Sequence, residues 1–368
     1  MVERFETIII GGGQAGLSVG YHLAKRGHSF VILEALGRVG DNWRRHWDSL
    51  RLYSPARYDR LPGMPFPAPD WTFPTRDQMA DYLQAYAERF ELEVRHGVRV
   101  QQIRRNERGF VVDTGEETLE SDNVVVAVGT FGGSSHVPAF ASGLDPAIVQ
   151  LHSSEYRNPA QLKPGPVLVV GASHSGADVA FEVATEHETV LSGPSRGQVP
   201  FPIEGKPARG LFPVLWFLAT RVLTIRTGLG RTMRTEARHH GGPLLRVRDR
   251  DLAAAGVERV LERTVGVREG MPVLEGGRRL EVANVVWCTG FRHDLDWIDL
   301  PVAGDDGWPL EDRGVTPVLG LYFSGLAFQQ SFSSMLVGGA GKDAEYVAAH
   351  IAARTRGGRS TVPSRSAA

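Results

Sequence analysis

The stretch that decides the fold is Thr7-Ile8-Ile9-Ile10-Gly11-Gly12-Gly13-Gln14-Ala15-Gly16, an apolar β-branched run that leads into a glycine-rich turn. It contains a complete G-x-G-x-x-G pattern, in which the first glycine permits a tight turn and the second lets a pyrophosphate approach the backbone. The third glycine lets the following helix pack against the strand. A second expected strand, 29–33, ends in Glu34, eighteen positions after Gly16, where an acid binds a ribose hydroxyl. These residues predict a dinucleotide-binding unit; the alternative is a glycine-rich turn of some other α/β protein.

A second turn of the same kind follows the apolar run Val167-Leu168-Val169-Val170 and reads Gly171-Ala172-Ser173-His174-Ser175-Gly176. Ser173, a small residue, stands where the first turn has its middle glycine. The next expected strand, 188–192, leads into Gly193-Pro194-Ser195-Arg196 without a carboxylate at its end. A carboxylate there would repel a 2′-phosphate, whereas Ser195 and Arg196 can bind one. The pattern predicts NADPH rather than NADH, unless Arg196 is an ordinary solvated loop arginine.

Two such turns in one chain predict an α/β protein with two Rossmann-like dinucleotide-binding domains, between which electrons pass. Three further short strands end in glycine turns, at Gly129, Gly290 and Gly325. Such turns let the backbone pass close to a cofactor or cross between domains. We therefore expect a first domain made of residues 1–155 and 282–356, with the second domain, 160–281, inserted into it. Residues 357–368 lack an apolar period and are expected to be disordered.

The composition excludes several classes of function. The 368 residues carry a formal net charge of −1, so nothing indicates a nucleic-acid partner. The single cysteine, Cys288, lies in an apolar strand and is expected to be a buried packing residue. Because there is only one cysteine, the chain can form neither an internal disulfide nor a C-x-x-C dithiol relay. A single cysteine also suits the reducing cytoplasm. The first strand begins too early to leave room for a signal peptide, and we see no metal-ligand spacing among the histidines.

Two segments leave alternatives open. The longest apolar stretch, 211–219, is too short to span a membrane and could be a core helix, a lid or a helix that contacts a lipid monolayer. The proline-rich segment 61–71 is expected to be a rigid surface loop. It could form a wall of a substrate site or have a structural role only. After it, Thr75 and Gln78 form a capping-box pattern that predicts an amphipathic helix up to Phe90.

Taken together, these motifs resemble the flavin-containing monooxygenases, class B flavoprotein monooxygenases, and most closely their short soluble indole-3-pyruvate type. The resemblance runs from Thr7 to about Ile351. Its signatures are the two glycine turns and the following stretches: Gly40-Asp41-Asn42-Trp43, Leu61-Pro62-Gly63-Met64-Pro65-Phe66-Pro67, Phe73-Pro74-Thr75-Arg76 and Cys288-Thr289-Gly290-Phe291. The family's linker motif is only half matched, since His152 and Tyr156 are present while Pro146 and Ile148 replace its phenylalanine and glycine.

The resemblance implies that the first domain holds FAD and the second holds NADPH. NADPH would pass hydride to the flavin, and O₂ would give a C4a-(hydro)peroxyflavin that transfers one oxygen atom to a small organic substrate. Because the cofactor carries the chemistry, no catalytic side chain is assigned and no metal is expected. The residues expected to contact FAD are Gly11, Gly13, Gln14, Ala15, Gly16, Glu34, Asn42, Trp43, Arg51 and Val100. Those expected to contact NADPH are Gly171, Ser173, His174, Ser175, Gly176, Ser195 and Arg196. Gly129 and Gly290 are expected beside a cofactor, and His152 and Tyr156 between the domains.

Some of these assignments have structural alternatives: Trp43 could be a core aromatic, and His152 and Tyr156 an ordinary linker pair. Two other functions also remain. The first is an NADPH:acceptor oxidoreductase or NADPH oxidase without oxygen transfer, and the second is a binding protein that holds nucleotides without catalysis. The substrate pocket is expected to lie among residues 53–71, 201–218 and 328–335, which are aromatic and apolar. They favour an uncharged or amphipathic organic substrate, whereas the oligomeric state cannot be predicted.

The assignment of Arg196 leads to a first testable prediction. Arg196→Ala removes a charge-assisted hydrogen bond to the 2′-phosphate, so the KM for NADPH should rise roughly 10- to 100-fold while the KM for NADH stays unchanged. Steady-state kinetics with both nucleotides measure this, and Arg104→Ala in the first domain is the control. An unchanged preference between the two nucleotides would contradict the assignment.

Overall fold

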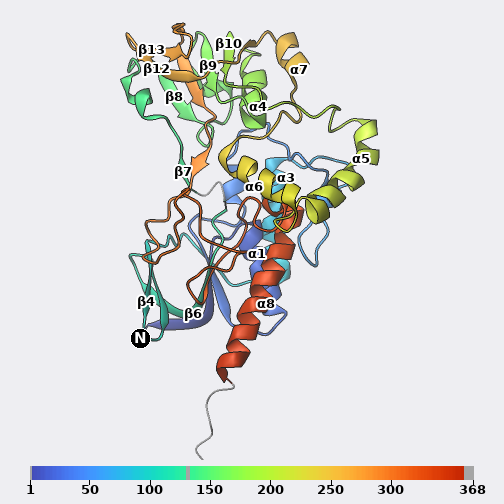
Figure 1. The fold of residues 1–368 in the computed structure, drawn as a ribbon, viewed down its shortest axis with the longest axis vertical. Coiled ribbons are helices and arrows are strands. Elements are labelled where there is room, and N and C mark those ends of the chain that lie inside the picture. The colour runs from blue at the N-terminus through green and yellow to red at the C-terminus, as the bar shows by residue number, and fades with distance from the viewer. Residues whose placement is uncertain (1, 130–132, 360–368) are drawn as a thin grey trace, which may run out of the picture.

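The structure, a computed structural model, describes residues 2–129 and 133–359 and contains two main β-sheets joined by a narrow crossing (Figure 1). In the first sheet, β1, β2, β3, β6 and β16 pair in parallel, and β4, β5 and β6 form an antiparallel meander. Its strands are β1 (Glu3–Ile10), β2 (Phe30–Glu34), β3 (Val94–His96), β4 (Gln102–Asn106), β5 (Gly109–Asp113), β6 (Thr118–Val126) and β16 (Leu321–Phe323).

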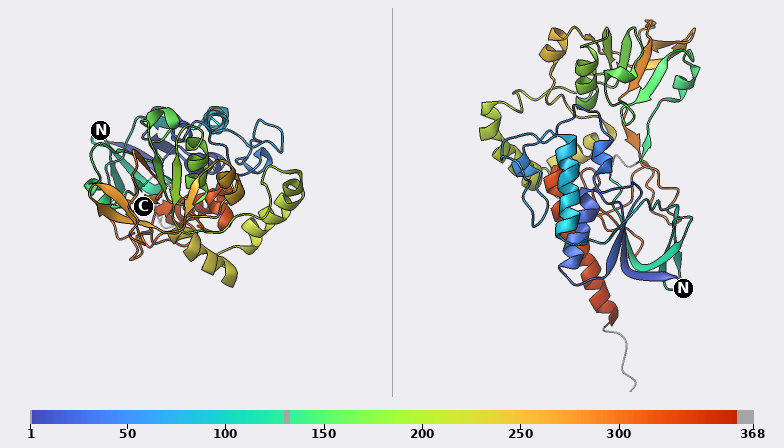
Figure 2. Two further views of the ribbon diagram at one scale, coloured as in Figure 1. Left: turned by 90° about the horizontal axis from the view of Figure 1, so that it is seen from above. Right: turned by 180° about the vertical axis from the view of Figure 1, so that it is seen from behind.

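The side chains of successive residues in β1 point to opposite faces of this sheet, because a β-strand is pleated. Ile9 packs on one face with three helices, and Ile8 and Ile10 pack on the other with β4 and β5. The helices are α1 (Gln14–Ala24), α3 (Arg76–Arg89) and α8 (Ala340–Arg359), which lie side by side in the view from behind (Figure 2). Because both faces are buried, the run Ile8-Ile9-Ile10 is apolar throughout rather than alternating.

The second sheet is wholly parallel, in the order β11-β10-β9-β14-β8. Its strands are β8 (Val149–His152), β9 (Val167–Val170), β10 (Thr189–Ser192), β11 (Glu258–Val260) and β14 (Asn284–Trp287). The boundaries expected at 155 and 282 are therefore wrong, since β8 and β14 both belong to the second sheet. The reason is physical: a buried central strand such as β14 must pair on both sides, and it pairs with β9 and β8.

The chain crosses between the two sheets at β7 (Ser134–Ser135) and β15 (Phe291–Arg292), which pair with each other (Figure 1). The second domain also carries the hairpin β12 (Thr264–Arg268) and β13 (Met271–Leu274), together with the helices α4 (His174–Val183) and α7 (Asp249–Ala254). The insertion of one domain into the other is thus visible in the chain path, with the crossing points near 135 and 291.

Helices α5 (Lys206–Phe217) and α6 (Gly228–His239) were expected in the second domain but pack on the first. Phe212 of α5 stacks on Tyr58, with ring centroids 5.7 Å apart. The segment between the helices forms an antiparallel bridge from Thr224 to Ser331. We call residues 206–239 the helical excursion; Figure 1 shows it near the upper end of α8 rather than beside the second sheet.

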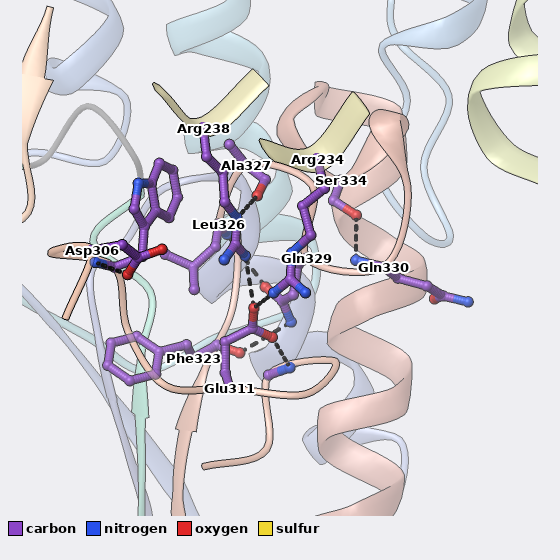
Figure 3. A network of polar contacts seen from close by, with 12 residues as sticks. Arg234, Arg238, Asp306, Glu311, Phe323, Leu326, Ala327, Gln329, Gln330 and Ser334 are labelled. Carbon is purple, nitrogen blue, oxygen red and sulfur yellow. Dashed lines mark hydrogen bonds and ion pairs between the residues drawn. The ribbon is translucent and has the colours of Figure 1, made fainter. Parts of the chain in front are cut away.

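A buried carboxylate holds α6 in place (Figure 3). The side chain of Glu311 is fully buried and accepts hydrogen bonds from Arg234 and Arg238, each at 2.7 Å. Its second oxygen accepts a hydrogen bond from the backbone N–H of Gly314 at 2.9 Å. Arg238 also donates to the carbonyl of Ala327, so the same helix is tied to the loop that precedes α8.

The start of α3 and the apolar stretch 211–219 show which local predictions hold in the structure. The capping box is confirmed, because Thr75 accepts from the Gln78 N–H and Gln78 returns the bond at the start of α3. The core-helix alternative for residues 211–219 is wrong, because Leu211, Val214, Leu215, Phe217 and Leu218 are exposed.

Residues 357–359 belong to α8 rather than to a disordered tail, and the rest of that expected tail lies outside the described residues. Within the described ranges, no helix is long and apolar enough to cross a bilayer.

The buried position of Glu311 leads to a second prediction. Glu311→Ala should lower the free energy of unfolding by about 3–5 kcal/mol, because it leaves the buried Arg238 guanidinium without its anion. Urea unfolding followed by far-UV circular dichroism measures this. The matched control is Glu236→Ala on the exposed face of α6, which should change stability by less than about 1 kcal/mol. Equal effects of the two substitutions would contradict the prediction.

Candidate functional site

The first glycine turn joins β1 to α1 at the carboxyl edge of the first sheet. Gly11 has a φ of +108°, and a Cβ there would lie 2.6 Å from the carbonyl oxygen of Ala127. A Cβ at Gly16 would collide with the carbonyl oxygen of Gly11. Gly13 is the N-cap of α1 and has no side chain that could cap the helix. The first-turn N–H groups of this helix are therefore available to an anion. The turn fits a dinucleotide pyrophosphate.

Glu34 lies at the end of β2, directly beside this turn. One carboxylate oxygen accepts a hydrogen bond from the Gly12 N–H at 2.7 Å, and the other accepts from the Leu36 N–H at 2.8 Å. The carboxylate thus braces the turn itself. Each oxygen keeps a second lone pair, so the geometry remains compatible with the expected bond to a ribose hydroxyl.

The structure brings Gln14, Asn42 and Trp43 together over the first turn. The indole N–H of Trp43 donates to the side-chain oxygen of Gln14 at 3.4 Å. The amide nitrogen of Asn42 lies 3.7 Å from the position that a Cβ of Gly13 would take. Asn42 and Trp43 belong to the short helix α2 (Asp41–Arg44), which begins after Gly40 at a φ of +86°. Trp43 also packs against the main core clusters of both domains, which supports its role as a core aromatic, and its contact with a cofactor stays a prediction.

The second turn repeats the geometry of the first. Gly171 has a φ of +107°, and a Cβ there would collide with the carbonyl oxygen of Cys288, as a Cβ at Gly11 would with Ala127. Gly171 N–H donates to the Ser192 carbonyl at 2.9 Å, and Gly11 N–H donates to the Leu33 carbonyl at 2.8 Å. The two turns are therefore equivalent positions of two similar units.

Ser173 replaces Gly13 at the N-cap because that position does not need a positive φ. Its φ and ψ are −84° and 179°, close to the −81° and −173° of Gly13. Its hydroxyl donates to the carbonyl of Gly242 at 3.0 Å and makes no capping bond. Ser175 and Gly176 follow in the first turn of α4, and a Cβ at Gly176 would collide with the carbonyl oxygen of Gly171.

Ser195 and Arg196 are exposed in the loop after β10. The Ser195 hydroxyl accepts a hydrogen bond from the Gly197 N–H at 3.3 Å. In the described part of the chain, the Arg196 guanidinium has no partner, so it is available to a phosphate.

The remaining expected cofactor residues are more scattered. The Arg51 side chain is exposed, and the Arg51 carbonyl accepts a hydrogen bond from Arg246 at 3.1 Å. Val100 is partly buried against the core on the β4–β5 side of the first sheet. Gly129 and Gly290 have φ angles of +73° and +81°, and a Cβ at either would meet no atom within 4 Å. Gly129 and Gly290 each lie two residues after the carbonyl that contacts a glycine turn, at Ala127 and Cys288.

His152 and Tyr156 lie at the junction of the domains, where both are buried. His152 Nε2 is 3.0 Å from the carbonyl oxygen of Gly290, next to the crossing strand β15. The Tyr156 hydroxyl donates to Glu182 at 2.9 Å, and its ring belongs to a cluster that contains Trp47 from the first domain's part of the chain. Burial lowers the pKa of His152, so the imidazole is neutral near pH 7. His152 and Tyr156 therefore contribute to the contacts between the two domains, through Gly290 and Trp47.

A polar cluster that the sequence did not reveal crosses the domain interface. The Tyr53 hydroxyl, from the first domain, donates to Asp178 of α4 at 2.9 Å. Arg246 lies 3.7 Å from Asp178, donates to the carbonyl of Leu52 at 2.7 Å and lies over the Tyr53 ring. The Tyr53 ring also meets His174 edge-on, at 5.0 Å between centroids. The only sequence signal was the spacing of His174 and Asp178, four residues apart on one face of a helix.

Burial dominates the electrostatics of this cluster. It raises the pKa of Asp178 to about 6, against the opposing effect of Arg246. It lowers the pKa of His174 to about 4, so this imidazole beside the second turn is uncharged at neutral pH. It also raises the pKa of the Cys288 thiol to about 12, which keeps the thiol protonated.

Comparisons with known proteins agree with this geometry. Residues 8–195 match the family model described as pyridine nucleotide-disulphide oxidoreductase. An oxidoreductase of the CzcO-like type from Geobacillus kaustophilus is 36% identical over 349 residues, covering 94% of this chain and 98% of that one. The protein named probable indole-3-pyruvate monooxygenase YUCCA7, from Arabidopsis thaliana, is 27% identical over 94% of this chain and 87% of its own length.

The fold has a solved counterpart. A flavin-containing monooxygenase from Stenotrophomonas maltophilia superposes with a TM-score of 0.76 at 25% identity, covering 96% of this chain and 100% of that one. The fold, the two equivalent turns and the matched relatives support binding of FAD and of a nicotinamide dinucleotide. The chain belongs to the pyridine nucleotide-disulphide oxidoreductase family, as a flavin-dependent oxidoreductase similar to CzcO-like proteins and more distantly to flavin monooxygenases.

Proposed function

We propose that this chain is an FAD-dependent, NADPH-consuming monooxygenase acting on a small organic substrate. It would place one atom of O₂ in the substrate and reduce the other to water with the two electrons of NADPH. The observation that carries the proposal is the pair of equivalent anion-binding turns in a chain with a single cysteine. Two dinucleotide sites predict electron transfer between cofactors, and the single cysteine limits where the electrons go next.

A disulfide relay needs two thiols, of which one attacks as a thiolate. This chain has only Cys288, whose thiol is buried and held protonated by its raised pKa. A diffusible acceptor is therefore favoured over an internal disulfide. The names of the matched relatives, among them indole-3-pyruvate and flavin-containing monooxygenases, favour O₂ as that acceptor.

The chain's own residues would bind and orient the cofactors. The free N–H groups at the start of α1 would hold the FAD pyrophosphate, with Glu34 toward the adenosine ribose. The corresponding groups of α4 would hold the NADPH pyrophosphate, with Arg196 toward the 2′-phosphate. When bound, flavin supplies the transfer of two electrons to O₂ that no side chain can perform.

An aromatic cluster supports an uncharged or amphipathic organic substrate. Tyr58 contacts Trp71, Phe212 and Trp216, with ring centroids 6.2, 5.7 and 5.0 Å away. The bridge from Thr224 to Ser331 adds the loop before α8 to the same region. The three stretches that the sequence analysis expected around a substrate thus meet at one side of the first domain.

Product analysis with labelled oxygen tests the proposal. The purified holoenzyme would be incubated with NADPH, ¹⁸O₂ and a panel of amines, thioethers, ketones and α-keto acids. We expect anaerobic bleaching of the flavin by NADPH and one ¹⁸O atom in a product, formed in proportion to the NADPH consumed. Hydrogen peroxide as the sole product with every substrate would overturn the proposal in favour of an oxidase. Failure of NADPH to bleach the flavin would overturn it in favour of a binding protein.

The raised pKa of Asp178 leads to a prediction about the domain interface. Because its pKa rises from 3.8 in the unfolded chain to about 6 in the fold, its stabilising contribution is complete below about pH 4 and is lost as the pH rises through 6. Relative to Asp178→Asn, the wild type should therefore lose up to about 3 kcal/mol of unfolding free energy between pH 4 and 7.

Urea unfolding at a series of pH values measures this difference. Asp305→Asn, at an exposed position, is the control and should follow the wild type at every pH. Parallel pH profiles of the wild type and Asp178→Asn would contradict the role given to Asp178.

A further inference from the structure

The outward face of α5 carries an apolar stripe that nothing in the described structure covers. Leu211, Val214, Leu215 and Leu218 follow the spacing i, i+3, i+4, i+7, and their exposed fractions are 42, 55, 41 and 37%. Phe217, at 58% exposed, extends the stripe at its end. We call these five residues the α5 stripe. An exposed apolar surface of this kind is typical of an interaction site.

The opposite face of the same helix already has its partners. Ala208 is fully buried, and Phe212 and Trp216 pack on Tyr58. The helix therefore keeps its position by its inner face, and the α5 stripe is not needed to hold it. Figure 1 shows α5 at the edge of the molecule, away from both sheets, and the exposed fractions of the α5 stripe show that it is open to solvent.

The charges around the stripe are mostly positive. The helical excursion, residues 206–239, contains seven lysine and arginine residues and one acidic residue, Glu236. Five of the cations are exposed: Lys206, Arg209, Arg221, Arg226 and Arg231. They flank the stripe at both ends, while the chain as a whole has a net charge of −1. This excess of cations is local to the helical excursion.

We propose that the helical excursion docks on the surface of an anionic phospholipid bilayer. The α5 stripe would lie at the boundary between headgroups and acyl chains, and the flanking cations would meet lipid phosphates. A helix with an outward apolar face and basic flanks lies in the interface plane and does not span the membrane. A second copy of the chain is disfavoured as the occupant, because two such surfaces face to face would bring like charges together. The inference goes beyond the proposed function and does not depend on it.

Vesicle flotation with the holoprotein tests the proposal. We expect binding to vesicles of 30% phosphatidylglycerol in phosphatidylcholine, weak binding to pure phosphatidylcholine, and release from the anionic vesicles in 0.5 M salt. Val214→Glu with Leu215→Glu should lower the partition coefficient at least tenfold. Arg221→Gln with Arg226→Gln should lower it about 25-fold, since each cation near an anionic surface contributes roughly fivefold.

Matched controls separate docking from general effects of substitution. Leu261→Glu with Leu319→Glu changes exposed leucines elsewhere, and Arg38→Gln with Arg250→Gln removes exposed cations elsewhere. Both pairs should leave vesicle binding unchanged. Far-UV circular dichroism and bound-flavin absorbance check that each variant is folded, and the two arginine substitutions in the excursion lie at exposed positions.

Three results would overturn the proposal. The first is no binding of the wild type to anionic vesicles at low salt. The second is binding that neither pair of excursion substitutions weakens. The third is a dimer in light scattering that Val214→Glu with Leu215→Glu converts to a monomer, which would show that a second copy covers the stripe.

Discussion

The rest of the structure depends on the close backbone contact that each glycine turn makes with the neighbouring strand. Gly11 lies against the carbonyl of Ala127, and Gly171 lies against the carbonyl of Cys288. In both turns, a Cβ would push the helix off the sheet and close the space in which a pyrophosphate can approach the amides. The contact therefore holds the helix N-terminus at the sheet edge while it leaves the first-turn N–H groups free. Packing and anion binding are satisfied by the same local geometry.

The two units are held together by polar contacts and by apolar packing, since Trp43, Trp47 and Leu50 lie against the core of the second domain. Arg246 donates hydrogen bonds to the backbone carbonyls of Arg51 and Leu52 and forms an ion pair with Asp178. Tyr53, from the first domain, donates a hydrogen bond to the same carboxylate. The narrow pairing of β7 with β15 carries the chain across. The helical excursion adds a separate connection, because it leaves the second domain and is anchored to the first by the buried Glu311.

Features of this protein that local residue patterns specify could be predicted from the sequence, whereas features made by contacts between distant segments could not. The strands that lead into glycine turns, the turns around Gly11 and Gly171 and the capping box of α3 were predicted because local patterns specify them. The domain boundaries were wrong because β8 and β14 are defined by pairing with β9, which no local pattern reveals. The same holds for Arg246 and Tyr53, which are 193 residues apart in the chain and meet only across the interface. The place of Glu34 at the end of its strand was predicted, whereas its bonds to Gly12 and Leu36 depend on backbone geometry that no local pattern reveals.

By itself, the sequence determined that this protein is an α/β chain with two nucleotide-binding turns and one cysteine, because those features rest on residue types at fixed short spacings. Only the tertiary structure decided which strands complete each sheet, that residues 206–239 belong with the first domain, and that the apolar stretch 211–219 faces outward rather than into the core. An apolar helix with two apolar faces has no preferred inward face in the sequence. The aromatic contacts of Phe212 and Trp216 with Tyr58 select that face, and they exist only after distant segments have packed together.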